Sequence, residues 1–229
     1  MAGILYVVAT PIGNLEDITF RALKILKEVD LILAEDTRET KKLLNSFQIK
    51  KTLLSLHQHS GQQRYNYILS LLNGGKNLAL VSEAGTPGIS DPGNKLISYL
   101  LSQNKKIKVV PIPGACALVA ALSISGFPSD RFIFLGFIPQ KKKRKKFLEE
   151  IIKADKTIVF YESTYRIIKT LTELNNLEKI LGQGKNKKIM VARELTKKFE
   201  TIYRGELKEV IEEIKKHLLK GEFVVVVSN

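Results

Sequence analysis

Short apolar runs that end in glycine- or proline-rich loops recur through the first half of the chain. Residues 4–9 read ILYVVA and precede TPIGN, and residues 78–81 read LALV and precede SEAGTPGISDPG. Continuous apolar runs of this length are typical of strands buried on both faces of a parallel sheet. Residues 65–72 carry apolar side chains at i, i+3, i+4 and i+7, which indicates an amphipathic helix. This alternation predicts an α/β fold with a largely parallel sheet.

The remaining elements follow the same pattern. Further strands are expected at 31–36 and 108–113, and further helices at 18–29, about 40–47 and 95–102. The second half offers five more strands, at 131–139, 156–163, 187–196, 200–207 and 222–229. FETIYRGEL follows VARELTKK as an antiparallel return, so the second sheet should be mixed. A proline-glycine entry into a small-residue helix indicates a hinge near residue 113. We therefore expect two α/β domains, an N-terminal one at 1–112 and a C-terminal one at 113–229.

The charge balance favours a polyanionic partner. Thirty-seven Lys and Arg residues against 23 Asp and Glu residues give a net charge of +14. Such a surplus attracts nucleic acid through long-range steering and counterion release, although a lysine-rich proteome would produce it as well. The run KKKRKK is the densest part, and it should contact RNA phosphates because like charges at a helix start repel each other and oppose the helix dipole. A solvated helix start near Phe147 is the alternative. The run comprises Lys141, Lys142, Lys143, Arg144, Lys145 and Lys146, and Arg193 and the KK of RELTKK would extend the same surface.

Several protein classes are disfavoured. The single cysteine cannot form an internal disulfide, and three histidines with one cysteine offer no zinc spacing. No apolar stretch reaches the roughly 18 residues of a membrane span. The N-terminus lacks a basic segment and leads directly into patterned sequence, so we expect a first strand there instead of a signal peptide. We expect a cytoplasmic protein without a metal or a membrane span.

Polar or breaker-rich loops follow the expected strands, where ligands of open α/β sheets lie. The five loops are TPIGN, AEDTRET, SEAGTPGISDPG, PIPGACA and FYESTYR. The absence of GxGxxG and GxxxxGK[ST] argues against dinucleotide and P-loop sites. Gly85 and Gly88 would let the backbone approach a flat or zwitterionic ligand, while Glu83 and Asp91 offer negative charge to a cationic group. Each loop taken alone is equally compatible with a tight turn.

Taken together, these loops resemble a known family. TPIGNLEDITFRALKIL, AEDTR, SEAGTPGISDPG, PIPGACALVAALSISG, FYESTYR and RELTKKFET occur in the order typical of the ribosomal small-subunit RNA 2′-O-methyltransferase I family. That family lies within the tetrapyrrole methylase superfamily. The resemblance extends from Leu5 to about Val227. Many members have SDAGTP in place of SEAGTP, and many continue with a small helical domain after the final strand.

The resemblance implies a fold and an activity. Members have two α/β domains with the active site in the cleft between them, bind S-adenosylmethionine there and form homodimers. They methylate the ribose 2′-hydroxyl of a cytidine in the decoding region of 16S rRNA, on the assembled small subunit. Carried over by motif, the cofactor contacts would be Pro11, Ile12, Ser82, Ala84, Gly85, Thr86, Ile89, Cys116, Ala117, Glu162, Val191 and Ala192.

Methyl transfer to a ribose hydroxyl needs a proton acceptor, which typically contributes about 10²- to 10⁴-fold in rate. We expect Asp36, with Arg38, to act as the catalytic or orienting pair, because AEDTR ends a strand and Arg38 suits a flanking phosphate. The other candidates are Glu35, His57, His59, Glu162 and Glu194. Two rival functions stay open. One is methylation of a tetrapyrrole precursor or a protein by a superfamily relative, and the other is a non-catalytic role in small-subunit assembly.

Overall fold

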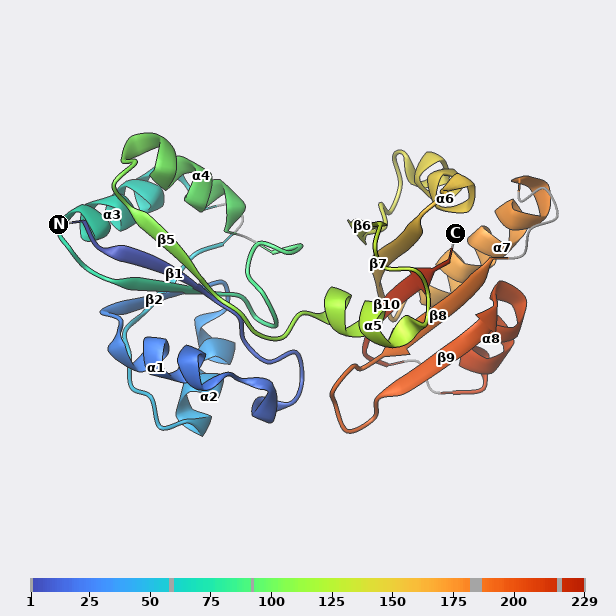
Figure 1. Ribbon diagram of the computed structural model, residues 1–229, viewed down its shortest axis with the longest axis horizontal. Coiled ribbons are helices and arrows are strands. Elements are labelled where there is room, and N and C mark those ends of the chain that lie inside the picture. Colours follow the sequence, from blue (N-terminus) through green and yellow to red (C-terminus); the bar gives the residue numbers. More distant parts are fainter. Residues whose placement is uncertain (1, 58–59, 92, 182–186, 218–219, 229) are drawn as a thin grey trace. The chain divides into compact units, whose positions relative to one another are not determined.

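The computed structural model describes residues 2–57, 60–91, 93–181, 187–217 and 220–228. The chain divides into two compact units, Met1–Cys116 and Ala117–Asn229. In Figure 1 the first unit runs from blue to green and the second from green to red. Each unit is built on a five-stranded sheet.

The sheet of the first unit is entirely parallel, with the order β3-β2-β4-β1-β5. Its strands are β1 (Ile4–Val8), β2 (Leu31–Ala34), β3 (Leu53–Ser55), β4 (Leu78–Val81) and β5 (Lys108–Ile112). Four of them match the expected strands. The three-residue β3 was not expected, because its TLLSL context is too short to show a period. It lies at an edge, and all three of its residues are half-buried.

Helices cover both faces of this sheet (Figure 1). They are α1 (Phe20–Glu28), α2 (Thr37–Ser46), α3 (Gln62–Asn73) and α4 (Asn94–Gln103), with a short 3₁₀ helix, η1 (Leu15–Asp17), ahead of α1. Leu26 of α1 and Leu44 of α2 share one apolar cluster with the sheet, while Leu72 of α3 and Leu100 of α4 share another. Helix α2 begins earlier than expected because the Asp36 carboxylate accepts a hydrogen bond from the Arg38 backbone amide and caps it.

The second unit has a mixed sheet, as expected from the sequence, and its strand order is β6-β7-β10-β8-β9. Strands β6 and β7 are parallel and the remaining pairs are antiparallel. The strands are β6 (Phe132–Phe137), β7 (Thr157–Ser163), β8 (Lys188–Arg193), β9 (Thr201–Glu206) and β10 (Glu222–Val227).

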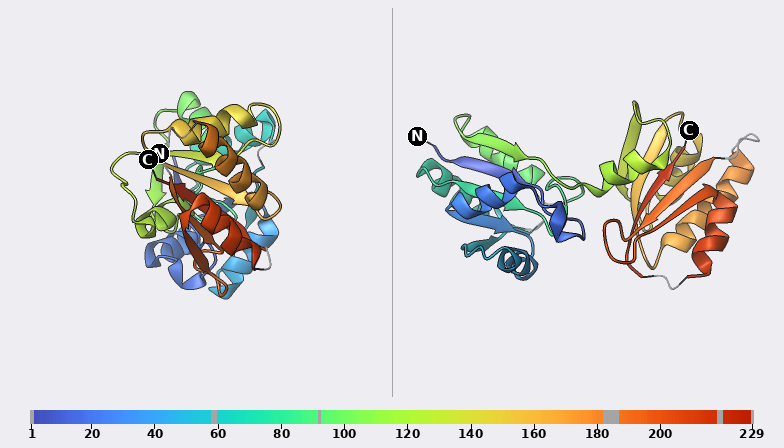
Figure 2. Two further views of the ribbon diagram at one scale, coloured as in Figure 1. Left: turned by 90° about the vertical axis from the view of Figure 1, so that its right-hand side faces the viewer. Right: turned by 60° about the horizontal axis from the view of Figure 1, so that its bottom comes forward.

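Helices α6 (Arg144–Lys153), α7 (Ile167–Leu181) and α8 (Leu207–Lys215) bury one face of this sheet (Figure 2). Helix α5 (Ala117–Ser125) packs against β7 and β10. Among the described residues, no helix combines the length and apolar character needed to cross a bilayer.

Candidate functional site

The loops after β1 and β4 are joined at the carboxyl edge of the first sheet. The Thr10 amide donates to the Gly85 carbonyl at 2.9 Å, and the Gly85 amide donates to the Thr10 carbonyl at 3.1 Å. Ser82 is buried, and its hydroxyl donates to the Gly85 carbonyl at 3.2 Å. Because the strands are parallel, their following loops open at one edge, and these bonds hold two of them in register.

The loop after β5 joins the same group. Thr86 Oγ1 donates to the Ala115 carbonyl at 3.0 Å, next to Cys116 in the chain. Gly85 has a φ of +80°, and a Cβ there would lie 3.1 Å from Ile12 Cγ2. A side chain at Gly85 would therefore strain the backbone and press on Ile12. The structure thus brings together expected residues from TPIGN, SEAGTP and PGACA.

The three joined loops carry mostly small side chains, so backbone groups make up much of their surface. Pro11 and Ile12 are buried, Cys116 is half-buried, and Ala84 and Ile89 are exposed. Small side chains at a glycine-containing turn leave backbone amides and carbonyls within reach of a ligand. Such a surface suits a flat or zwitterionic molecule.

Three acidic residues, Glu35, Glu83 and Asp91, lie near this edge and repel one another when charged. Burial raises the pKa of Glu35, and the nearby Glu83 raises it further, while His57 acts in the opposite direction. Burial, with Glu35 and Glu83, raises the pKa of Asp91 to about 6, against a hydrogen bond from Ser82. Mutually repelling carboxylates favour either a cationic ligand or a shared proton.

Asp36 differs from its neighbour Glu35. Arg38 binds it through three donors, with backbone N, Nε and Nη2 at 2.7, 3.2 and 2.7 Å from its carboxylate oxygens. These hydrogen bonds hold the pKa of Asp36 well below its usual range. Asp36 is therefore a poor proton acceptor, which argues against the expected catalytic role. The expected orienting role, together with Arg38, stays a prediction. Arg38 keeps most of its side chain, 86%, exposed.

Of the two histidines of LHQHS, the structure describes one, His57. His57 is exposed and its Nε2 lies 2.6 Å from Ser55 Oγ, whereas His59 lies outside the described residues.

Val191 and Ala192 lie inside the second sheet. Both are fully buried in β8, an internal strand. Val191 pairs with Val225 on one side and Tyr203 on the other, and Ala192 is likewise paired on both sides. Their backbone groups lie within the two ladders, and the expected backbone contact with an adenine stays a prediction. Ala117 begins α5 and is half-buried.

Glu162 is a buried acid of the second unit. Its side chain is 0% exposed, and its carboxylate pairs with Arg166 Nη2 at 2.8 Å. Thr170 Oγ1 donates to its other oxygen at 2.7 Å, and the Ser163 amide donates at 2.8 Å. These internal partners satisfy the carboxylate, which gives Glu162 a structural role in the second unit; its expected cofactor contact stays a prediction.

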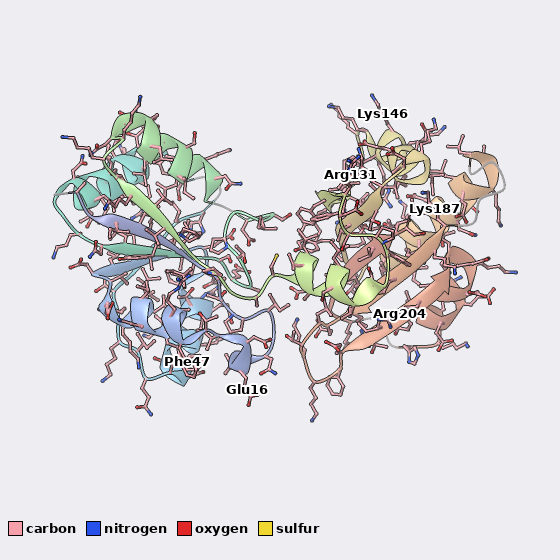
Figure 3. All side chains as sticks on the ribbon, viewed as in Figure 1. Glu16, Phe47, Arg131, Lys146, Lys187 and Arg204 are labelled. Carbon is pink, nitrogen blue, oxygen red and sulfur yellow. The ribbon has the colours of Figure 1, made fainter. Side chains whose placement is uncertain are left out.

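Arg144 is buried, unlike the five lysines beside it in the sequence. Helix α6 begins at Arg144, not near Phe147, and this side chain is buried. Its guanidinium donates to Glu173 at 2.8 Å, to Thr170 at 2.8 Å and to the Pro139 carbonyl at 3.2 Å. Arg144 thus anchors the helix start and is removed from the expected RNA contacts. The five lysines of the run are exposed, and Lys146 extends away from the sheet in Figure 3.

The hairpin between β8 and β9 uses one of its lysines internally. Lys197 Nζ lies 2.8 Å from Glu194 and 2.9 Å from Glu222. This ion pair, together with a hydrogen bond from the Glu222 amide, lowers the pKa of Glu194 against the effect of burial. Glu194 is therefore set aside as a proton acceptor, and Lys198 is the exposed lysine of the pair.

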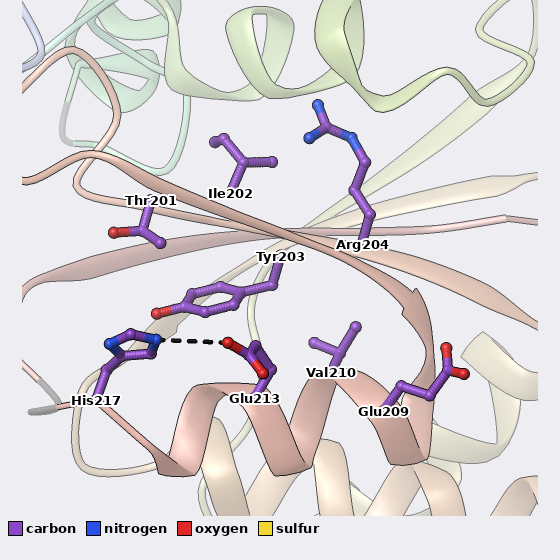
Figure 4. Close-up of a pocket in the computed structure, with 8 residues that line it drawn as sticks. All are labelled: Thr201, Ile202, Tyr203, Arg204, Glu209, Val210, Glu213 and His217. Carbon is purple, nitrogen blue, oxygen red and sulfur yellow. Dashed lines mark ion pairs between the residues drawn. The ribbon is translucent and has the colours of Figure 1, made fainter.

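A separate pocket lies between β9 and α8 (Figure 4). His217 Nε2 is 3.7 Å from Glu213 there, and the buried Tyr203 hydroxyl has no hydrogen-bond partner among the described residues. None of the residues expected from the sequence lines this pocket. The described residues also contain no group of three or more metal-ligating side chains suited to a metal ion.

Comparison with known proteins decides the family. Residues 4–211 match the family described as Tetrapyrrole (Corrin/Porphyrin) Methylases. Ribosomal RNA small subunit methyltransferase I of Synechocystis sp. is 48% identical over 99% of this chain and 79% of its own length. The protein of the same name from Thermotoga maritima is 46% identical over 99% and 98%, and that of Escherichia coli O157:H7 is 45% identical over 99% and 78%. The chain belongs to the ribosomal RNA small subunit methyltransferase I family of tetrapyrrole methylases.

Solved structures of other tetrapyrrole methylases confirm the expected fold. Cobalt precorrin-4 methyltransferase is 18% identical with a TM-score of 0.70, covering 98% of this chain and 94% of its own. Uroporphyrin-III C-methyltransferase from Thermus thermophilus, complexed with S-adenosylhomocysteine, is 18% identical with a TM-score of 0.65 over 99% and 98%. The two-unit α/β architecture predicted from the strand and helix pattern is the architecture of this methyltransferase family.

Proposed function

We propose that this methylase transfers a methyl group from S-adenosylmethionine to the ribose 2′-hydroxyl of a cytidine in the decoding region of 16S rRNA. The observation that carries the proposal is identity of 45–48% to proteins named ribosomal RNA small subunit methyltransferase I over almost the whole chain. The net charge of +14 supports a polyanionic substrate such as RNA.

The joined loops of the first unit fit this cofactor. When bound, S-adenosylmethionine supplies an electrophilic methyl group on a positively charged sulfonium. Small side chains and a glycine turn leave room for a flat adenine and a zwitterionic amino acid, and nearby carboxyl groups favour a cation. We propose that Pro11, Ile12, Ser82, Ala84, Gly85, Thr86, Ile89, Cys116 and Ala117 hold it.

Glu35 is the group we assign as proton acceptor. Efficient general bases have pKa values near the working pH, and burial with a neighbouring Glu83 moves the pKa of Glu35 in that direction. The Arg38 ion pair moves the pKa of Asp36 the opposite way. Arg38 lies three residues after Glu35, in the first turn of α2, and is exposed, so it can orient a phosphate that flanks the target nucleotide.

The exposed lysines of the run would hold the RNA backbone. Lys141, Lys142 and Lys143 precede α6, and Lys145 and Lys146 lie in its first turn. Arg144 is buried beneath them, and none of the five ammonium groups forms an ion pair with another described residue. Phosphates would relieve their mutual repulsion.

The test uses isotopically labelled S-adenosylmethionine and small ribosomal subunits from cells that lack this modification. Label recovered in a cytidine ribose of 16S rRNA is the expected result. Label in an added porphyrinogen or in ribosomal protein would move the protein to another branch of the superfamily. No transfer to any acceptor, with the protein still bound to subunits, would support an assembly factor.

A cytoplasmic homodimer is part of the same proposal, since the ribosomal substrate lies in the cytoplasm and the family resemblance implies dimers. Sedimentation equilibrium should give twice the mass of the 25.8 kDa chain. A single-chain mass across the working concentration range would contradict the dimer.

A further inference from the structure

Four strand ends of the second unit meet at one edge of its sheet. Ser163 at the end of β7 pairs with Glu222 at the start of β10, and Phe223 pairs with Arg193 at the end of β8. Arg193 in turn pairs with Thr201, where β9 begins. The loops beyond these residues therefore share one edge, although they are far apart in the sequence.

Hydrogen bonds tie these loops to each other. Thr164 Oγ1 donates to the Gly221 carbonyl, and Arg193 Nε donates to the Lys220 carbonyl at 2.7 Å. Arg166 Nη1 donates to the Ile138 carbonyl at 2.9 Å, which connects the loop that leads into the lysine run. The edge is thus a connected surface to which the exposed lysines of 141–146 are attached.

Two aromatic side chains stand exposed at this edge. Tyr165 is 97% exposed two residues after β7, and Phe199 is 68% exposed two residues before β9. A cation lies beside the second ring, because Lys198 Nζ is 5.7 Å from the Phe199 centroid, and Arg193 pairs with Thr201, two residues after Phe199. The strands that carry the two rings are three spacings apart, roughly 14 Å. Rings so separated would engage two different groups instead of enclosing one.

The hairpin that carries Phe199 is held in a strained conformation. Glu194 and Thr196 have φ values of +53° and +65°, a region that L-residues, and β-branched ones above all, avoid. Lys197 ties the loop to Glu222, and the Thr196 amide donates to Glu200 at 2.6 Å. The Thr196 hydroxyl is buried without a hydrogen-bond partner among the described residues. Strain of this kind persists where the surrounding contacts enforce it, and it concentrates at functional segments.

We propose that Tyr165 and Phe199 are a stacking platform for unpaired bases of the RNA substrate, with Lys198 contacting the adjoining phosphates. The inference rests on the proposed function and adds how the RNA is held. Proteins recognise single-stranded RNA by stacking unpaired bases on exposed aromatic rings beside cationic groups. A rigid hairpin presents Phe199 with little ordering cost on binding. The enzyme should therefore prefer an unpaired target segment to a duplex.

The experiment measures binding of a short single-stranded oligoribonucleotide that carries 2-aminopurine, whose fluorescence is quenched by stacking. Full-length wild-type protein should quench it and bind it more tightly than the same sequence in a duplex. Phe199→Ala and Tyr165→Ala should each weaken binding by about 5- to 100-fold and reduce the quench. Phe199→Trp should restore both. The matched control is Tyr67→Ala, an exposed aromatic on α3 of the first unit, which should bind as wild type does.

The outcomes separate this inference from the proposed function. Wild-type methylation of small subunits with unchanged binding and quench in Phe199→Ala and Tyr165→Ala would overturn the stacking platform alone. If Phe199→Ala or Tyr165→Ala changed the sedimentation mass and left RNA affinity unchanged, the stacking platform would also be overturned. The rings would then form a contact between two copies of the chain. Loss of methylation in the wild-type protein itself would count against the proposed function.

Discussion

Glu35 and Asp36 are adjacent in the chain, yet their surroundings move their pKa values in opposite directions. Glu35 is partly buried near Glu83, so its charged form is disfavoured. Asp36 is half-buried, accepts hydrogen bonds from Arg38 and caps α2, so its charged form is stabilised. A base must accept a proton near neutral pH, and this difference is the reason for proposing Glu35.

Glu35→Gln should lower single-turnover methylation by about 10²- to 10⁴-fold without changing affinity for S-adenosylhomocysteine. In the wild type the rate should rise with pH as Glu35 loses its proton, and this limb should be absent from the variant. Glu39→Gln, which changes an exposed acid on α2, should behave as wild type. If Asp36→Asn removed the pH-dependent limb while Glu35→Gln kept it, the base would be Asp36.

At the scale of elements, a buried polar chain joins β7, α6 and α7. Glu162 on β7 binds Arg166 and Thr170, and Thr170 accepts from Arg144 at the start of α6. Both arginines also bind carbonyls of the Ile138–Pro139 segment. The loop that leads into the exposed lysines is therefore positioned from beneath by two guanidinium groups.

Arg166→Ala should lower the free energy of unfolding by about 3 kcal/mol, because it leaves the Glu162 carboxylate buried without its ion-pair partner. Adding Glu162→Gln should recover part of the loss, since a neutral amide costs less to bury. Urea denaturation measures both. Lys169→Ala on the exposed side of α7 should change stability by less than about 0.5 kcal/mol. Equal losses for the single and double variants would rule out charge burial as the cause.

At the scale of the molecule, the surplus of positive charge is unevenly used. Some cations serve internal contacts, as Arg144 and Lys197 do, while the lysines around the start of α6 are exposed. The exposed cations determine how strongly salt weakens binding to RNA, because each phosphate contact releases counterions.

Replacing Lys141, Lys142 and Lys145 with Gln should reduce the slope of log K against log salt concentration by about 2 for a single-stranded RNA. Fluorescence anisotropy over a salt series gives the slope. The control removes the same charge elsewhere, through Lys208→Gln, Lys215→Gln and Lys216→Gln on or just after α8. Matching slope changes in the two triple variants would mean that net charge, and not this surface, binds the RNA.

The sequence by itself determined the fold class, the strand and helix order, and the family. Each of these follows from local pattern, since apolar runs, helical spacing and breaker loops depend on neighbours along the chain. The three-residue β3 was missed because so short an edge strand carries no period.

Only the tertiary structure decided which polar residues are free to act. Arg144 was indistinguishable from five lysines until Glu173 and Thr170, from a distant helix, were seen to bind it. The Glu162 carboxylate accepts a hydrogen bond from Thr170 of α7, and Val191 and Ala192 pair with a strand on each side. Burial and pKa depend on groups that folding brings from elsewhere in the chain. A motif can therefore identify the loop, whereas the charge and exposure of each residue in it are set by packing.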